Sequence, residues 1–387
     1  MRPAAVAVIG GGVMGASVAC HLALRGQHDV LILDRADEPG AGSTGRATGG
    51  YRAQYGSAIN VRLSLLAREK LRRFEDDTGV DPEYLPVGYL WLATTAGELA
   101  ALAAGRAVQH AEGLHEAVEV SPAEIARINP AVRLDGVAGG AFCPSDGFLR
   151  PLRMLEGYLA TATRMGVRVA WGVEVGEMRR GGDGRITEIG TSHGTLAVGA
   201  VVNAAGPWAA AVGAMAGVVV PVTPLRRQVA VTAPCDFLPA GMPMTIWAGD
   251  GFHLRVRDGR VLLLRPTEGV PGRPFEAGMD PAWVEAVTAM AHARVPVLRG
   301  ASIDRDRCWA GLYEMSPDKH ALLGAAPGCP NLFLINGSSG HGVMHAPALG
   351  QLLAEIICDG RATTLDVGAL EPARFAAGRP NPVSELL

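Results

Sequence analysis

Three glycines and one aspartate near the N-terminus have the spacing of a site that binds a dinucleotide. Gly10, Gly12 and Gly15 form the pattern G-x-G-x-x-G, and Asp34 follows nineteen residues after the last of them. In this pattern the first glycine permits a tight turn, the second lets backbone approach a pyrophosphate, and the third lets a helix pack closely on a strand. Asp34 is placed to accept hydrogen bonds from ribose hydroxyl groups and to repel a 2′-phosphate. The pattern therefore predicts NAD or FAD, and not NADP, as the ligand.

A second segment, residues 40–56, reads GAGSTGRATGGYRAQYG and is rich in glycine, serine and threonine. Its hydroxyl groups and backbone amides can donate hydrogen bonds to further phosphate oxygens, and Arg46 and Arg52 offer guanidinium groups to an anion. An amphipathic helix follows at once, and a loop fixed between rigid elements is well placed for function. The alternative interpretation is a mobile surface loop.

Glycine and histidine recur near the C-terminus, in INGSSGHGVMHAPALG at residues 335–350. An apolar strand ends at Ile335, and a helix is predicted by leucine and isoleucine at 349, 352, 353, 356 and 357. We expect Pro347 in the first turn of this helix, where proline is tolerated. A second helix N-terminus, with free N–H groups and a positive dipole end, is thereby predicted to face an electron-rich group.

The elements that position the N-terminal pattern are a strand, a helix and a second strand. Residues 4–9 form a short apolar strand, a helix runs from the glycines to Arg25 and Gly26, and residues 28–35 read HDVLILDR. Fully apolar strands joined by a helix are typical of a buried parallel sheet. The N-terminal segment therefore has the strand–helix–strand order of the α/β class.

A different pattern occupies residues 218–310, which are rich in short alternating strands. A hairpin turn is predicted at Asp258-Gly259, and one helix is predicted at 281–293. We interpret this stretch as a separate antiparallel sheet that forms a wall of the substrate site.

The composition excludes several classes of protein. The chain has 387 residues, a net charge of −3 and a pI near 6.4, without a basic segment that could follow a phosphate backbone, so nucleic acid is not an expected partner. Its six cysteines are scattered without a CxxC pair, which favours a reduced, cytoplasmic enzyme without a metal site. Four glycines interrupt the signal-peptide-like N-terminus, and no later segment is apolar for long enough to span a membrane.

Four pieces of the sequence together resemble the D-amino-acid-oxidase-type superfamily of FAD-dependent amine oxidoreductases. Within it the chain is most similar to the group of sarcosine oxidase β-subunit, glycine oxidase and L-proline dehydrogenase. The pieces are the glycine pattern with Asp34, GSTGRATGGYR at 42–52, VVNAAGPWA at 201–209, and GLYEMSPDKHALLG at 311–324 followed by NGSSGHGVMHAPALG.

The resemblance implies an α/β fold of two domains, in which a Rossmann-like domain binds FAD and an antiparallel sheet binds substrate. The FAD-binding domain is implied at 1–82, 146–217 and 311–387, and the substrate-binding domain at 83–145 and 218–310. The final helix N-terminus is implied to face the N1–C2 edge of the flavin, where it stabilises the anionic reduced form. Cofactor contacts are implied at Gly10, Gly12, Val13, Met14, Gly15, Asp34, Arg35, Ser43, Thr44, Arg46, Thr48, Gly49, Gly50, Val175, Ala205, Gly206, Trp208, Gly340, His341, Gly342, Val343 and Met344.

Four residues are the candidates for catalysis and substrate binding. We predict that Arg52 holds a substrate carboxylate with its forked guanidinium, and that Tyr313 hydrogen-bonds the same group. His253 is expected to line the pocket together with Arg255 on the same strand, and His341 to meet the flavin. For both histidines, a bond to local backbone is the alternative.

Departures from the family narrow the expectation. Relatives with covalently bound flavin carry a cysteine or a histidine where this chain has Gly311 and Arg46, so non-covalent FAD is expected. Neither Lys70 nor Lys319 falls at the site of the lysine that activates oxygen near the flavin in monomeric sarcosine oxidases. The electron acceptor is therefore left open among oxygen, a quinone and a partner subunit.

Together these features predict an enzyme that oxidises a carboxylated amine, such as sarcosine, glycine or proline. A hydride passes to flavin N5, and the imine is then hydrolysed. Two alternatives stay open. One is an NAD-dependent dehydrogenase, and the other is a flavin-containing assembly factor or subunit of a larger complex without catalysis.

Overall fold

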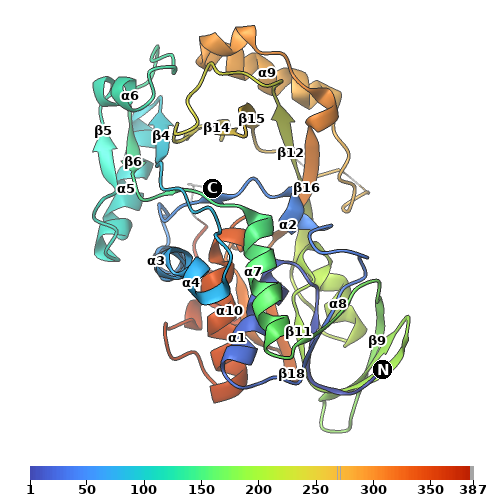
Figure 1. Cartoon of the computed structure of the whole chain (residues 1–387). Coiled ribbons are helices and arrows are strands. Elements are labelled where there is room, and N and C mark those ends of the chain that lie inside the picture. Colours follow the sequence, from blue (N-terminus) through green and yellow to red (C-terminus); the bar gives the residue numbers. More distant parts are fainter. Residues whose placement is uncertain (268, 271, 384–387) are drawn as a thin grey trace.

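Two eight-stranded sheets organise the chain, one in the lower half of Figure 1 and one in the upper half. The structure is a computed structural model, and it describes residues 1–267, 269–270 and 272–383. The chain crosses between the two halves several times, so each half combines stretches that are far apart in sequence. A small third sheet pairs β3 (Gly50–Tyr51) with β7 (Gly147–Phe148).

The first sheet has the parallel centre that the strand–helix alternation predicts. Parallel pairing joins β8 to β2, β2 to β1, β1 to β11 and β11 to β18, and the other strands extend the sheet by antiparallel pairing. Its strands are β1 (Ala4–Ile9), β2 (Val30–Leu33), β8 (Arg168–Ala170), β9 (Val175–Arg180), β10 (Ile186–Thr191), β11 (Gly194–Asn203), β17 (Leu322–Ala326) and β18 (Cys329–Asn336).

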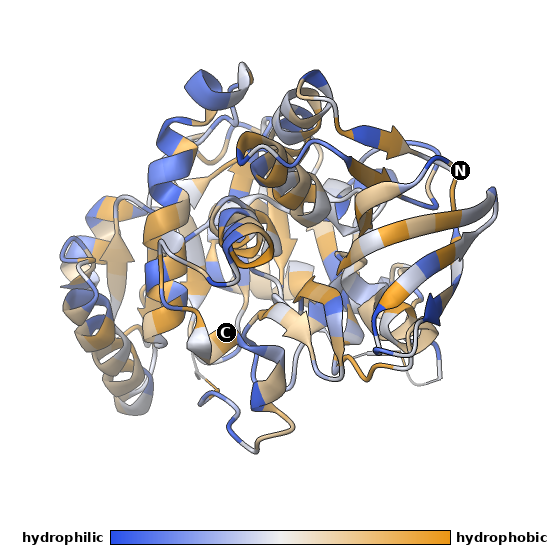
Figure 2. Cartoon of the chain, turned by 90° about the horizontal axis from the view of Figure 1, so that it is seen from below, coloured by the Kyte–Doolittle hydropathy of each residue, from blue (hydrophilic) through white to orange (hydrophobic). Residues whose placement is uncertain are grey.

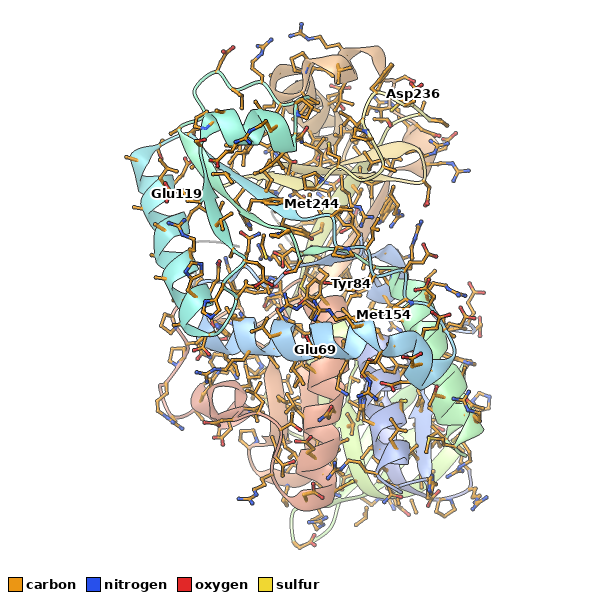
Figure 3. All side chains as sticks on the ribbon, turned by 60° about the vertical axis from the view of Figure 1, so that its left-hand side comes forward. Glu69, Tyr84, Glu119, Met154, Asp236 and Met244 are labelled. Atoms are coloured by element: carbon orange, nitrogen blue, oxygen red, sulfur yellow. The ribbon has the colours of Figure 1, made fainter. Side chains whose placement is uncertain are left out.

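Helices cover one face of this sheet and a smaller core covers the other. Val6 and Val8 of β1 belong to the core beneath the long helices, whereas Ala7 and Ile9 belong to the core that includes α8. This alternation follows from the two-residue period of a strand. In Figure 3, Glu69 marks α3 and Met154 marks α7. The helices on the first face are α1 (Val13–Leu24), α3 (Ala58–Arg72), α4 (Phe74–Thr78), α7 (Pro151–Arg164) and α10 (Gly342–Asp359), and α8 (Ala209–Met215) lies on the other face.

The second sheet is antiparallel except where β4 and β13 pair in parallel. The turn predicted at Asp258-Gly259 joins two of its strands, with φ of 53° and 66°. Met244 marks β13 in Figure 3. In sheet order the strands are β16 (Trp309–Met315), β12 (Thr223–Val231), β15 (Arg260–Leu264), β14 (His253–Arg257), β13 (Met244–Trp247), β4 (Tyr89–Ala93), β6 (Gly139–Cys143) and β5 (Val118–Val120).

Three helices flank the second sheet, namely α5 (Ala96–Ala111), α6 (Pro122–Ile128) and α9 (Pro281–Arg294). Figure 2 shows hydrophobic residues along the strands of the interior and hydrophilic residues on the outer turns of peripheral helices. None of the helices in the described ranges is long and apolar enough to cross a membrane. The predicted division into two domains stays a prediction, and β16 crosses its boundary at residue 311.

Candidate functional site

A cavity of about 800 Å³ lies between the two sheets, within the range of about 300–1,000 Å³ that is typical of ligand sites. The carboxyl ends of β1 and β2 line one part of it, and one face of the second sheet lines another. All of the residues predicted above to contact cofactor or substrate line this cavity, with the exception of Gly15 and Arg255. Their binding roles stay predictions.

The glycine pattern lies at the carboxyl end of β1. The Gly10 N–H donates to the Leu33 carbonyl oxygen at 2.8 Å, so the turn out of β1 is tied to β2. Gly10 has a φ of 109°, and a Cβ on it would lie 2.4 Å from the Ala204 carbonyl oxygen. A Cβ on Gly15 would lie 1.9 Å from the Gly10 carbonyl oxygen. Gly15 therefore permits the close packing of α1 that the sequence predicts, although it does not face the cavity.

Asp34 follows β2 and is held by two backbone N–H groups. Its Oδ2 accepts from Gly11 at 2.7 Å, and its Oδ1 accepts from Ala36 at 2.8 Å. These bonds orient the carboxylate at the cavity beside the glycine turn. Arg35 and Trp208 also line the cavity, with the guanidinium carbon 4.3 Å from the centre of the indole ring.

The serine and threonine loop contains a short helix, α2 (Ser43–Arg46), that the sequence reading missed. Four residues are too few to show a helical period. The Thr44 hydroxyl oxygen accepts from the Val13 N–H at 3.1 Å and so caps the first turn of α1, while the Ser43 hydroxyl donates to the Leu312 carbonyl at 2.8 Å. The Arg46 guanidinium donates to the carbonyl oxygens of Ala41 and Gly42.

The C-terminal glycine loop leads into α10, which begins at Gly342. Pro347 therefore lies in the second turn, and its predicted place in the first turn is wrong. The helix continues through it because the fixed φ of proline is helical, at the cost of one backbone bond. Residues 342–344 thus form the first turn, whose N–H groups have no partner inside the helix. Met344 is fixed by the Tyr55 hydroxyl, which donates to its Sδ at 3.2 Å.

Arg52 follows β3 and is 5% exposed. Its guanidinium carbon lies 4.6 Å from the centre of the Tyr55 ring and 5.1 Å from that of Trp91. Its Nη2 lies 3.3 Å from Nε2 of His341. A guanidinium has no acceptor, so Nε2 of His341 accepts and the ring is neutral. Burial and the charge of Arg52 both lower the pKa of His341 well below its usual value, which favours the same state.

One face of the second sheet borders the cavity. Register places Ile246, His253, Leu264 and Val229 side by side on neighbouring strands, and two further residues, Arg227 and Tyr313, share this face. We name these six residues the sheet wall. His253 donates from Nδ1 to the Gly251 carbonyl at 2.8 Å, and burial lowers its pKa to about 4, so it is neutral near pH 7.

Six charged residues that line the cavity were missed by the sequence analysis, namely Glu38, Glu174, Arg227, Arg265, Glu314 and Lys319. Lys319 has a left-handed backbone (φ 59°) in the turn that begins at Ser316, and this turn brings it to the cavity. Lys319 therefore lines the cavity and Lys70 does not, and the expectation that neither lies at the site of an oxygen-activating lysine stays a prediction. The pattern of alternation in β12 and β16 could have grouped Arg227 and Glu314 with their neighbours, but it carries no information on which face meets the cavity.

Arg255 does not line the cavity, and its predicted place there is wrong. Its guanidinium lies 3.5 Å from the centre of the Phe148 ring and donates to the Thr48 carbonyl at 2.7 Å. It borders a second, smaller hollow instead. The side chain thus supports the loop that forms the cavity and does not enter the cavity itself.

The arrangement fits a dinucleotide with a carboxylated amine beside it. Two helix N-termini, of α1 and α10, and the hydroxyl groups of α2 reach the cavity, and such groups bind phosphates and other electron-rich groups. The buried guanidinium of Arg52, beside the start of α10, suits a carboxylate. Among the described residues there is no group of three or more histidine, cysteine or acidic side chains that could hold a metal ion.

Comparison with protein families matches residues 5–356 to the family described as FAD dependent oxidoreductase. The L-proline dehydrogenase of P. horikoshii is similar in structure, with a TM-score of 0.90 at 27% identity over 98% of this chain and 100% of that chain. The glycine oxidase of Geobacillus kaustophilus has a TM-score of 0.84 at 25% identity over 96% of this chain and 99% of that chain.

Among curated relatives, the 4-methylaminobutanoate oxidase (formaldehyde-forming) of Paenarthrobacter nicotinovorans is 27% identical over 97% of this chain. The chain spans 46% of that protein's length, so about half of the relative has no counterpart in this sequence.

Proposed function

Because this chain belongs to the family of FAD-dependent oxidoreductases, we propose that it is an enzyme that oxidises a carboxylated amine, such as an N-methyl, cyclic or simple amino acid. The observation that carries the proposal is the place of Arg52, buried at the cavity beside the loop that begins α10. A forked guanidinium in such a place binds a carboxylate by two parallel hydrogen bonds. Proline, glycine and 4-methylaminobutanoate, in the names of the three similar proteins, are amines with a carboxylate.

FAD, the cofactor of the family, supplies the acceptor for a hydride when bound. We assign its ADP half to Gly10, Gly12 and Asp34, and its isoalloxazine to the segment 340–344. The support for this orientation is the order of groups along the cavity. The α1 N-terminus and a ribose-binding carboxylate lie together, and the α10 N-terminus lies beside the buried Arg52.

The chain's own charges select the protonation state of the substrate. Arg52, Arg227 and Lys319 all line the cavity, and positive charge disfavours an ammonium ion and favours the free amine. The free amine has the lone pair that assists departure of a hydride from the neighbouring carbon. His253 and His341 are neutral because burial lowers the pKa of both, so neither requires a counter-ion.

We also propose that FAD is held without a covalent bond. Gly311 and Arg46 occupy the places where covalent relatives carry a cysteine or a histidine, and they lie against each other at the cavity. Within the described ranges, no cysteine lines the cavity. Acid precipitation should therefore release the flavin into the supernatant, and flavin that stays with the precipitated protein would contradict the proposal.

The decisive test of the reaction is anaerobic. The purified protein is mixed with N-methyl, cyclic and simple amino acids, and the visible absorbance of oxidised flavin is followed. We expect at least one of them to bleach it, and subsequent addition of oxygen or a quinone to identify the acceptor. A yellow protein that no amine bleaches would overturn the proposal in favour of a non-catalytic flavoprotein. A colourless protein would support the alternative of a nicotinamide-dependent dehydrogenase.

A further inference from the structure

We propose that the amine substrate carries a second carboxylate and that Arg227 binds it. This inference rests on the proposed function, since it concerns the substrate of the same cavity. Arg52 holds the carboxylate next to the amine, and Arg227 holds a carboxylate further along the molecule. The substrate class is then a dicarboxylate, such as an N-carboxyalkyl amino acid.

The first observation is the place of Arg227 on the sheet wall. On β12 it pairs with Gly311 of β16, and Val229, two residues further on, pairs with Leu264. Because side chains on a strand alternate, Arg227 and Val229 point to the same face, whose members line the cavity. Its guanidinium carbon lies 5.3 Å from the centre of the Tyr313 ring. The side chain is thus part of the cavity and not of the outer surface.

The second observation is that Arg227 has no carboxylate partner among the described residues. Its Nη1 donates to the carbonyl oxygens of Arg226 and Thr267, and burial lowers its pKa below the usual range. Two buried arginines have an acid within reach, since Arg68 meets Glu116 at 2.6 Å and Arg374 meets Asp318 at 2.8 Å, whereas Arg255, outside the cavity, donates to carbonyl oxygens as Arg227 does. A desolvated guanidinium without such a partner is costly, and an anionic ligand would supply the missing charge.

The third observation links Arg227 to Arg52. Arg52, Arg227 and His253 all line this cavity, and the charges of both arginines contribute to lowering the pKa of His253. They come from different elements, since Arg52 follows β3 beside His341 and Arg227 lies on β12 beside Tyr313. The apolar residues of the sheet wall, Ile246, Leu264 and Val229, line the same space and suit a short methylene chain between two charged ends.

The test measures binding of two ligands that cannot be oxidised as amines. Thiodiacetate has two carboxylates, and (isobutylthio)acetate has methyl groups in place of the oxygens of the second. Dissociation constants are obtained from the change that each ligand causes in the visible spectrum of the FAD-loaded protein. We expect the wild-type protein to bind thiodiacetate on the order of 10- to 100-fold more tightly than (isobutylthio)acetate, because a charge-assisted bond to a partly buried guanidinium is worth that much.

The preference should depend on Arg227 and not on its neighbour. In Arg227→Gln we expect the ratio of the two dissociation constants to fall to within about 3-fold of unity, while (isobutylthio)acetate still binds. In Arg227→Lys part of the preference for thiodiacetate should remain, because the charge is kept. Arg226→Gln is the matched control, because Arg226 lies on the opposite face of β12 and donates to the Gly278 carbonyl at 3.0 Å. It should leave both constants unchanged.

Two results would overturn the inference. One is a wild-type protein without preference for thiodiacetate, and the other is an Arg227→Gln protein that loses both ligands equally, since Arg227 would then hold the first carboxylate. Failure of the proposed function is separate: it would appear as flavin that no amine bleaches. In that case a thiodiacetate preference that depends on Arg227 would still support the second anion site.

Discussion

The cofactor end of the cavity is built mainly from backbone groups, whereas the sheet wall is built from side chains. At the cofactor end the groups that face the ligand are mainly backbone, brought close by Gly10, Gly15 and the first turns of α1 and α10. At the sheet wall they are side chains, such as Arg227 and His253, carried by strands whose own backbone groups are used in pairing. A site made of backbone constrains residue type at a few positions, whereas a site made of side chains can change its ligand by single substitutions.

Substitution of Gly15 should have the largest effect, because it disturbs the cofactor end of the cavity, which is built from backbone groups. A Cβ at 1.9 Å from the Gly10 carbonyl oxygen forces α1 away from β1, so we expect Gly15→Ala to lose about 3 kcal/mol or more of stability and to reduce bound FAD about 10-fold or more. Thermal unfolding and the ratio of flavin to protein after purification measure both.

A matched control is Gly182→Ala, in the turn between β9 and β10, where a Cβ would meet no atom within 4 Å. It should keep both the stability and the flavin of the wild-type protein. Full flavin content in Gly15→Ala would show that the close approach of α1 to β1 does not shape the cofactor site.

Substitution of Arg52 should leave the cofactor end intact and damage the substrate end. Arg52→Ala removes the proposed clamp, and we expect KM for carboxylated amines to rise on the order of 100-fold with FAD still bound. Arg62→Ala is the control, since Arg62 lies at an exposed position of α3 and forms an ion pair with Glu112. An unchanged KM in Arg52→Ala would contradict the assignment and would place the carboxylate at another residue of the cavity.

The third effect concerns pH and is the smallest. Oε2 of Glu314 is inaccessible to solvent and lacks a hydrogen-bond partner among the described residues, and burial raises the pKa of this carboxyl to about 7 from its ordinary 4.5. A carboxyl whose pKa is raised on folding destabilises the folded state as pH rises from the unfolded value through the folded one. The wild-type protein should therefore lose stability from this group between about pH 4.5 and about pH 7.

Glu314→Gln removes that dependence, so we expect it to be more stable than the wild-type protein by about 1–3 kcal/mol at pH 8 and similar to it near pH 5. Denaturant unfolding at the two pH values measures the difference. Glu156→Gln, at an exposed position on α7, should show no such pattern. A constant difference at both pH values would mean that Glu314 is ionised throughout this range.

The predictions from sequence succeeded where backbone geometry restricts the residue. The strand, glycine turn and helix at Gly10–Gly15 and the hairpin at Asp258-Gly259 were predicted because those turns admit few residue types. The helix α2 was missed because it is shorter than a period can reveal, and α10 began before Pro347 because its tertiary packing outweighs one lost bond.

The sheet wall could not be predicted in the same way. Alternation along β12 groups Arg227 with Val229, but the register with β15 and β16 decides which face meets the cavity, and that register depends on strands 30 or more residues away in sequence. For the same reason Arg255, two residues after His253, was expected at the cavity and lies beyond its edge against Phe148. The substrate therefore has to be inferred from structure.

The most direct test is a crystal structure of the FAD-loaded protein with thiodiacetate. We expect the ribose of the ADP half at Asp34, the isoalloxazine at 340–344 and one carboxylate of the ligand on the Arg52 guanidinium. FAD in the opposite orientation, or a ligand whose carboxylates both lie away from Arg52, would contradict the division of the cavity into a backbone-built cofactor end and a side-chain-built substrate end.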